Sequence, residues 1–169
     1  AMTAHRRENI GKPLENICKA VKRIVENNKD IQIVYPVHLN PAVRETVFEI
    51  LGNEERIHLT DPIDVEDMHN VMSRSFLVMT DSGGLQEEGP HFGIPVVVLR
   101  TETERPEAVE AGTVQVAGVR EEEIYAIVNR LLNDREAYQK MARAVNPYGD
   151  GHASERITEE IIKWGKAHV

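Results

Sequence analysis

Apolar residues follow two patterns along this chain, short continuous runs and longer stretches with helical spacing. A continuous run predicts a strand that is buried on both faces. Runs of this kind cover residues 76–79 and 96–99, and further strands are predicted at residues 31–35, 57–60 and 113–116. Apolar residues three and four positions apart predict amphipathic helices. These stretches cover residues 13–28, 43–51, 64–72, a segment from residue 85, 121–132, 135–144 and 153–165.

Predicted strands and helices alternate along the chain. That order predicts an α/β fold with a mostly parallel sheet covered by helices on both faces. Right-handed crossovers make it a doubly wound, Rossmann-like sheet, in which ligands bind beyond the carboxyl ends of the strands. Residues 1–4 resemble the end of a further strand, so we expect the chain to be a fragment of a longer protein.

Composition excludes several classes of function. The 169 residues suffice for one domain with its own core. A net charge of −8 argues against a nucleic-acid partner, because such domains need a basic face. Cys18 is the only cysteine, which excludes an internal disulfide and fits a cytoplasmic protein. No apolar run reaches the length of a membrane span, and we expect neither a metal nor a cofactor.

The turn Ser82-Gly83-Gly84, which follows the predicted strand 76–79, is the strongest candidate for a ligand site. A strand, a glycine turn and a helix leave backbone N–H groups unpaired at the positive end of the helix dipole, where phosphate binds. The glycines allow close approach and the serine adds a donor. Glu88 lies four residues after Gly84 on the same helix face, where it could accept the hydroxyls of a ribose. Taken alone, the turn fits a packing role equally well.

Charged and polar residues in other loops should meet this turn at one edge of the sheet. His5 follows the first predicted strand, and this position favours a functional role for its side chain. Arg6 and Arg7 point in different directions on an extended backbone, so only one of them is expected to face a given ligand. His38 and Arg105 follow other strands, but a lone loop histidine is usually structural and an alternating charge pattern is typical of a solvated loop.

Four motifs, in the right order, resemble the non-hydrolysing UDP-N-acetylglucosamine 2-epimerases. They occupy residues 5–9, 81–88, 103–107 and 146–151. The resemblance covers essentially the whole chain, but only the C-terminal half of those enzymes. It implies two Rossmann-like domains in a GT-B arrangement with the substrate between them. Residues 1–169 would then form a single UDP-binding domain, with the N-terminal domain of the parent enzyme absent and a terminal helix at 152–167.

The resemblance also implies roles for individual residues. The implied UDP-binding residues are Ser82, Gly83, Gly84, Glu88, Arg105 and Met68. The turn would hold the diphosphate, the carboxylate would hold the ribose, and uracil would lie against the backbone near the methionine. His5 would be catalytic, because a cationic or donor group beside departing UDP stabilises the developing charge. Arg6, Arg7 and His38 are candidates for a second, allosteric UDP-GlcNAc site.

The implied reaction interconverts UDP-GlcNAc and UDP-ManNAc by elimination of UDP to 2-acetamidoglucal and re-addition. Proton transfer needs carboxylates, which the resemblance places in the N-terminal half. We therefore expect this chain to bind UDP without turnover, and the full-length enzyme to be a homodimer. The terminal helix would cross toward the missing domain, which would leave its apolar side chains partly exposed here.

Three other interpretations remain. The chain could be the nucleotide domain of a GT-B glycosyltransferase, part of a hydrolysing epimerase, or a non-catalytic nucleotide-sensing module. Incubating the full-length protein with UDP-GlcNAc and no acceptor separates them. A non-hydrolysing epimerase alone yields UDP-ManNAc, and a hydrolysing one releases free ManNAc and UDP.

Overall fold

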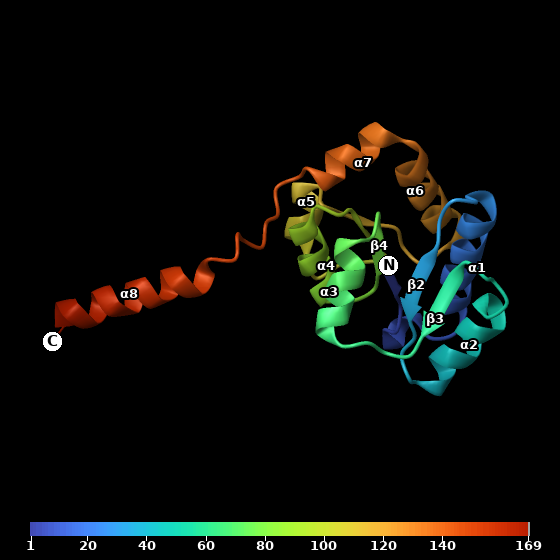
Figure 1. Ribbon diagram of the computed structural model, residues 1–169, viewed down its shortest axis with the longest axis horizontal. Helices are drawn as coiled ribbons and strands as arrows, with labels where there is room; N and C mark the ends of the chain where they lie inside the picture. The colour runs from blue at the N-terminus through green and yellow to red at the C-terminus, as the bar shows by residue number, and fades with distance from the viewer. Residues whose placement is uncertain (169) are drawn as a thin grey trace.

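Short parallel strands form the centre of the fold, which the computed structural model describes for residues 1–168 (Figure 1). One sheet contains, in order, β1 (Met2–Thr3), β4 (Val78–Thr80), β5 (Val96–Val98) and β6 (Val114–Val116). The other pairs β2 (Ile33–Pro36) with β3 (Ile57–Thr60). Every pairing is parallel, as the alternation of strands and helices predicts.

The two sheets meet where β1 contacts β2. The strands therefore follow the spatial order β3-β2-β1-β4-β5-β6, which reverses direction between β1 and β4. This is the order of a doubly wound fold, and its switch point is where such folds bind ligands. The Rossmann-like prediction is confirmed, but the sheet is split, because β1 and β2 form no ladder of hydrogen bonds.

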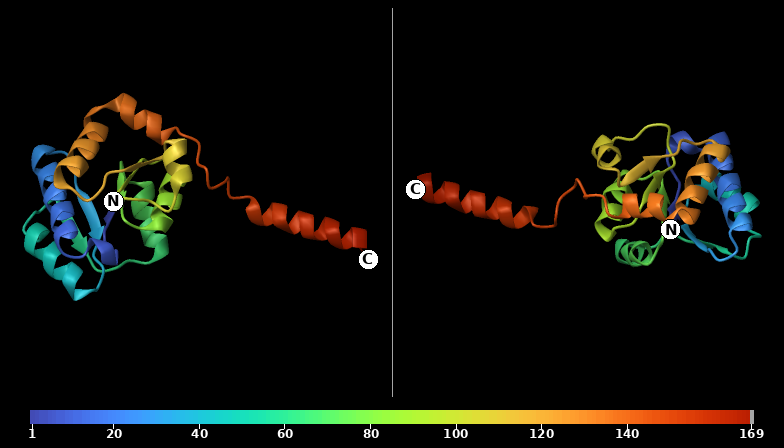
Figure 2. Two further views of the ribbon diagram at one scale, coloured as in Figure 1. Left: turned by 180° about the vertical axis from the view of Figure 1, so that it is seen from behind. Right: turned by 90° about the horizontal axis from the view of Figure 1, so that it is seen from above.

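Helices cover both faces of the strands (Figures 1 and 2). The α-helices of the body are α1 (Lys12–Asn27), α2 (Pro41–Leu51), α3 (Val65–Ser73), α4 (Gly83–Glu88), α5 (Pro106–Ala111), α6 (Glu121–Asn133) and α7 (Arg135–Ala142). Two short 3-10 helices are η1 (Arg7–Asn9) and η2 (Gly89–Phe92). Asp64 caps α3 as its position predicts, since its side chain accepts a hydrogen bond from the backbone N–H of Asp67 at 2.8 Å.

Alternate residues of the central strands point into two separate cores. Met79 and Val97 join the core beneath α1, α2 and α6, whereas Val78 and Val98 join the core beneath α3 and α5. This alternation explains why the sequence shows continuous apolar runs, since both faces of the sheet are buried.

Several predicted boundaries were wrong. The run 76–79 was expected to be a buried strand, but Phe76 is 50% exposed and stacks on Tyr138 with ring centroids 4.1 Å apart. The strand begins at Val78 because the pairing with β5 starts there. Helix α4 begins at Gly83 rather than at residue 85, and α7 ends at Ala142 rather than at residue 144.

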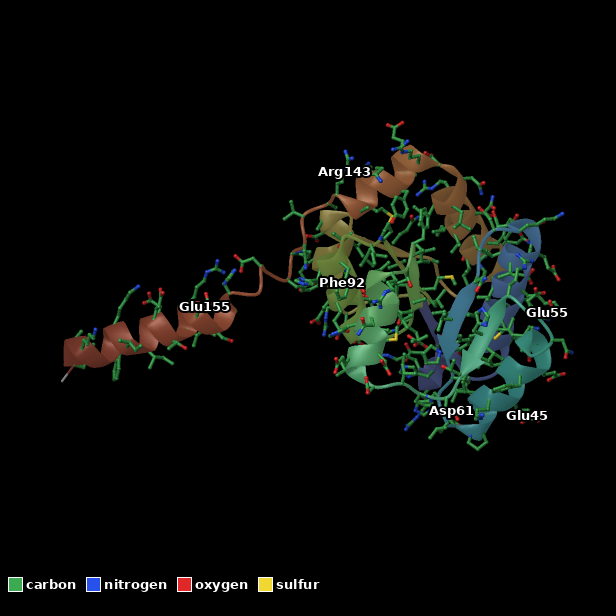
Figure 3. The ribbon with its side chains drawn as sticks, viewed as in Figure 1. Glu45, Glu55, Asp61, Phe92, Arg143 and Glu155 are labelled. Carbon is green, nitrogen blue, oxygen red and sulfur yellow. The ribbon has the colours of Figure 1, made fainter. Side chains whose placement is uncertain are left out.

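The last helix, α8 (Ala153–His168), extends away from the body and buries none of its residues (Figure 1). Arg143 marks the end of α7 and Glu155 the first turn of α8, with a connecting segment between them (Figure 3). The apolar positions of α8 are at least half exposed, as expected. They are Ile157, Ile161, Ile162 and Trp164.

A cavity of about 610 Å³ opens beside the amino ends of β1, β2 and β4. Ile31, Leu77 and Val128 contribute to its largely apolar lining, and Ala1 lies at its edge. The Ala1 ammonium donates a hydrogen bond to the Leu77 carbonyl at 2.8 Å, and burial lowers its pKa to about 5. None of the helices described within residues 1–168 is both long and apolar enough to cross a membrane.

Candidate functional site

The carboxyl ends of β1 and β4 form one side of the candidate site. Thr3 and Thr80 are register partners, and their hydroxyl groups hydrogen-bond at 2.7 Å. The two strands therefore end at the same level. The loop that carries His5 and the turn that carries Ser82 leave the sheet side by side, as the sequence predicts for a parallel sheet.

Asp81 joins these two segments. Its side chain is fully buried, and its Oδ2 atom accepts hydrogen bonds from the backbone N–H groups of His5 and Arg6, both at 2.8 Å. The same oxygen accepts from the Asn9 side chain at 2.9 Å, and Asn9 also donates to the Leu99 carbonyl at 3.0 Å. One carboxylate oxygen thus fixes the loop after β1 to the end of β4.

Two guanidinium groups converge on the glycine turn. A Cβ atom placed on Gly83 would lie 3.7 Å from Nη2 of Arg6 and 3.8 Å from Nη2 of Arg105. These arginines come from different loops, after β1 and after β5. Because α4 begins at Gly83, its first backbone N–H groups face the same region. Two fixed cations and free backbone donors make this turn suited to a diphosphate.

Glu88 and His69 lie next to the turn. A Cβ atom placed on Gly84 would lie 3.4 Å from Oε1 of Glu88, so the carboxylate folds back over the turn. The other carboxylate oxygen, Oε2, lies 3.1 Å from Nε2 of His69 on α3. His69 also packs at a tilt against Phe92, with ring centroids 5.9 Å apart. Met68 precedes His69 and lies near the surface of the core, 9% exposed.

Hydrogen bonds to Glu87 and Thr103 hold Arg105 in place. Its Nε donates to Glu87, and this hydrogen bond raises the pKa of Arg105, so the guanidinium stays charged. Its backbone N–H donates to the Thr103 hydroxyl at 3.0 Å. The Thr103 hydroxyl in turn donates to Oε1 of Gln86 at 2.5 Å. The position of Arg105 therefore depends on α4 as well as on its own loop.

Acidic side chains form ion pairs with Arg6 and Arg100. Glu104 lies 3.5 Å from Nη2 of Arg6 and 3.3 Å from Nη2 of Arg100. Arg100 also donates to Glu8 at 2.7 Å. The hydrogen bond from Arg100 lowers the pKa of Glu104, which keeps this carboxylate ionised. The network links the loops after β1 and β5 through Arg6 and Arg100.

A smaller cavity, of about 210 Å³, lies beside the turn. Its polar lining includes His5, His38 and Ser82, and Met68 and Leu85 contribute apolar surface. The rings of His5 and His38 stack with centroids 5.4 Å apart. His38 therefore lies in the same pocket as His5, although the sequence alone favoured a structural loop position.

The structure brings most of the predicted site residues together. Those at the turn or in the adjoining cavity are His5, Arg6, His38, Met68, Ser82, Gly83, Gly84, Glu88 and Arg105. Arg7, in η1, is the exception, since it neither approaches the turn glycines within 4 Å nor lines the adjoining cavity. Of the described residues 1–168, no group of three or more His, Cys, Asp or Glu side chains is placed to hold a metal.

Sequence reasoning missed the residues that support the site. His69 had no assigned role, and Asp81, Gln86 and Thr103 appeared only as parts of motifs. Their contacts join segments far apart in the sequence, so spacing alone gave no signal for them. The one available clue was that Asp81 directly follows a buried strand, where a buried carboxylate needs donors.

Comparison with known proteins decides the family. The sequence model described as "UDP-N-acetylglucosamine 2-epimerase" matches residues 1–162. The chain belongs to this family. The match confirms the resemblance to UDP-N-acetylglucosamine 2-epimerases that the four motifs indicated.

Individual members of the epimerase family are similar over nearly the whole chain. A putative UDP-N-acetylglucosamine 2-epimerase of Thermotoga maritima is 64% identical over 161 residues, covering 95% of this chain and 43% of the relative. An S. aureus MnaA–UDP co-structure matches with a TM-score of 0.93 and 53% identity, covering 98% of this chain and 45% of that one. A Neisseria meningitidis UDP-GlcNAc 2-epimerase bound to UDP-GlcNAc matches with a TM-score of 0.91 and 42% identity, covering 96% and 44%. The chain thus spans less than half the length of these relatives.

Proposed function

We propose that this chain is the UDP-binding half of a non-hydrolysing epimerase that interconverts UDP-GlcNAc and UDP-ManNAc. The observation that carries the proposal is the convergence of Arg6 and Arg105 on Gly83, with the Glu88 carboxylate folded over Gly84. The similarity to structures with UDP and UDP-GlcNAc bound supports the same assignment.

In this proposal the nucleotide lies across the start of α4. The diphosphate binds the backbone at Gly83 and Gly84, the Ser82 hydroxyl and the two guanidinium groups. The ribose hydroxyls donate to Glu88, which His69 holds from the other side at 3.1 Å. Uracil lies toward α3, against the backbone near Met68.

His5 acts at the bond that breaks. When the bond between the sugar C1 and the diphosphate oxygen cleaves, negative charge develops on that oxygen, and the imidazole stabilises it as a cation or hydrogen-bond donor. Loss of the C2 proton leaves 2-acetamidoglucal, and re-addition of UDP with the proton returned to the other face of C2 inverts that centre. The carboxylates for proton transfer come from the absent N-terminal domain, so this chain binds UDP without turnover.

The proposal extends to the full-length protein. It is a cytoplasmic homodimer in which this domain and an N-terminal domain form a GT-B arrangement, and α8 crosses toward that domain. Of the candidates for a second UDP-GlcNAc site, Arg7 and His38 remain, because this proposal places Arg6 on the diphosphate of the first. The stacking of His38 on His5 favours His38 for a site that adjoins the first.

Calorimetric titration of this chain with UDP, UMP and ADP tests the proposal. UDP should bind more tightly than UMP because of the second phosphate, and more tightly than ADP because of the base. Equal affinity for UDP and ADP would overturn the assignment of uracil. Turnover is tested separately by incubating the full-length protein with UDP-GlcNAc and no acceptor, where formation of UDP-ManNAc is the expected result and free ManNAc the contrary one.

A further inference from the structure

Two buried polar side chains lie on either side of the glycine turn. Asp81 directly precedes it and Gln86 follows it in α4, and both are 0% exposed. Burying polar groups of this size is unfavourable unless their hydrogen bonds are satisfied. The Asp81 carboxylate accepts all its hydrogen bonds through Oδ2 from the segment that carries Arg6, and among the described residues its Oδ1 has no partner. Gln86 accepts a hydrogen bond from the loop that carries Arg105.

Asp81 holds the first arginine at two points. Its carboxylate accepts the backbone N–H of Arg6 at 2.8 Å, and its backbone carbonyl accepts the side-chain Nε–H of Arg6 at 3.1 Å. The backbone position and the direction of the side chain are therefore both fixed. Arg7, the next residue, has neither link and is exposed.

Gln86 holds the second arginine through one intermediate. Its Nε2 donates to the Ser82 carbonyl at 3.2 Å, which fixes the amide so that Oε1 can accept from Thr103 at 2.5 Å. Thr103 Oγ1 then accepts the backbone N–H of Arg105 at 3.0 Å. The loop after β5 is thereby tied to the first turn of α4.

We propose that Asp81 and Gln86 are positioning residues that hold Arg6 and Arg105 as a preformed clamp for the diphosphate of a nucleotide. This inference rests on the proposed function. An arginine side chain that is already ordered loses little conformational freedom when it binds, so preorganisation raises affinity without a new contact. Glu104 and Glu87 stabilise the same arrangement when no anion is present, because each pairs with one of the two guanidinium groups.

Two conservative variants, Asp81→Asn and Gln86→Met, test the clamp by titration with UDP and with uridine. Asparagine keeps the size of the side chain but replaces charge-assisted hydrogen bonds with weaker neutral ones. Methionine keeps the volume of glutamine but makes neither hydrogen bond. Each variant should weaken UDP binding roughly tenfold, the effect of losing the interaction of one guanidinium group with the diphosphate. Uridine affinity should not change, because uridine has no diphosphate.

Double variants show whether each residue acts through its arginine. If it does, adding Gln86→Met to Arg105→Ala should cause no further loss of UDP affinity. Adding Asp81→Asn to Arg6→Ala should cause a smaller loss than Asp81→Asn causes by itself, because Asp81 also holds the backbone of His5. Val47→Ala is the matched control, since this buried residue of α2 destabilises the fold without contacting the site. It should lower the unfolding temperature and leave the ratio of UDP to uridine affinity unchanged.

A second measurement does not depend on any ligand. The heteronuclear NOE of the backbone amides of Arg6 and Arg105 reports how rigid the chain is at each arginine, and these are the amides that Asp81 holds directly and Gln86 holds through Thr103. Arg6 should become more mobile in Asp81→Asn and Arg105 in Gln86→Met, with no change in the other arginine. Unchanged NOE values, or equal losses for UDP and uridine, would overturn the clamp. Absence of UDP binding in the unaltered chain would instead count against the proposed function, while the NOE values still decide whether the clamp exists.

Discussion

The Nε2 atom of His69 lies 3.1 Å from the Oε2 atom of Glu88, which joins α3 to α4 beside the glycine turn. The other oxygen of the carboxylate faces Gly84. One oxygen is thus held by the protein while the other remains available. This arrangement directs the carboxylate toward the region where the proposed ribose would lie.

Replacing Glu88 with glutamine should weaken UDP binding roughly tenfold, because an amide accepts the ribose hydroxyls less strongly than a carboxylate does. Calorimetry with UDP and with 2′-deoxy-UDP checks this. The variant should affect UDP more than the deoxy ligand, which has one hydroxyl fewer. Glu66→Gln, on the exposed side of α3, is the control. Equal losses for both ligands would remove Glu88 from the ribose site.

Arg6 and Arg7 form a matched pair for a second test. Arg6→Ala should weaken UDP binding by tenfold or more, because it removes a charged donor near Gly83. Arg7→Ala should change the affinity by less than about twofold, since Arg7 is exposed. Raising the salt concentration should weaken binding to the unaltered chain more than to Arg6→Ala. A larger effect from Arg7→Ala would contradict the structure.

In the 169-residue chain with Ala1 as its first residue, the amino group of Ala1 should make stability depend on pH. Burial lowers its pKa from 8.0 to about 5, so between these values the unfolded chain binds a proton that the folded chain does not. The free energy of unfolding should therefore rise with pH from 5 to 8.

Nα-acetylation isolates this effect from other titrating groups. The acetyl group has room in the adjoining cavity of about 610 Å³, and the amide N–H can still donate to the Leu77 carbonyl. The acetylated chain should unfold at a higher temperature at pH 6, and the difference should shrink by pH 8. A constant difference across this range, in calorimetric scans, would show that the amine is not buried in its neutral form.

Ending the chain after Gly149 should leave the stability of the body unchanged. Helix α8 buries none of its residues, so its removal should shift the unfolding temperature by no more than about 2 °C. The emission of Trp164, which is 66% exposed, should be that of a solvated indole before unfolding as well as after. A larger shift in temperature, or a blue-shifted emission, would mean that α8 packs against the body or against a second copy.

The position of the site could be predicted from the sequence more easily than the set of side chains that meet there. Strand ends, glycines and Glu88 are visible in the chain because each reflects local geometry. The choice between Arg6 and Arg7 was not visible. It depends on hydrogen bonds to Asp81, which lies 75 residues from Arg6 in the sequence. Phe76 was misplaced for a similar reason, since its burial depended on where β4 begins to pair with β5.

The sequence by itself determined the α/β class, the parallel strands and the edge of the sheet at which doubly wound folds bind ligands. Those features follow from periodicity and turn chemistry, which act over a few residues. Only the tertiary structure decided which side chains meet at that edge. The pairing of Thr3 with Thr80 brings two loops together, and the buried groups Asp81 and Gln86 then fix the arginines. Contacts of this kind depend on the packing of distant segments, which no local pattern records.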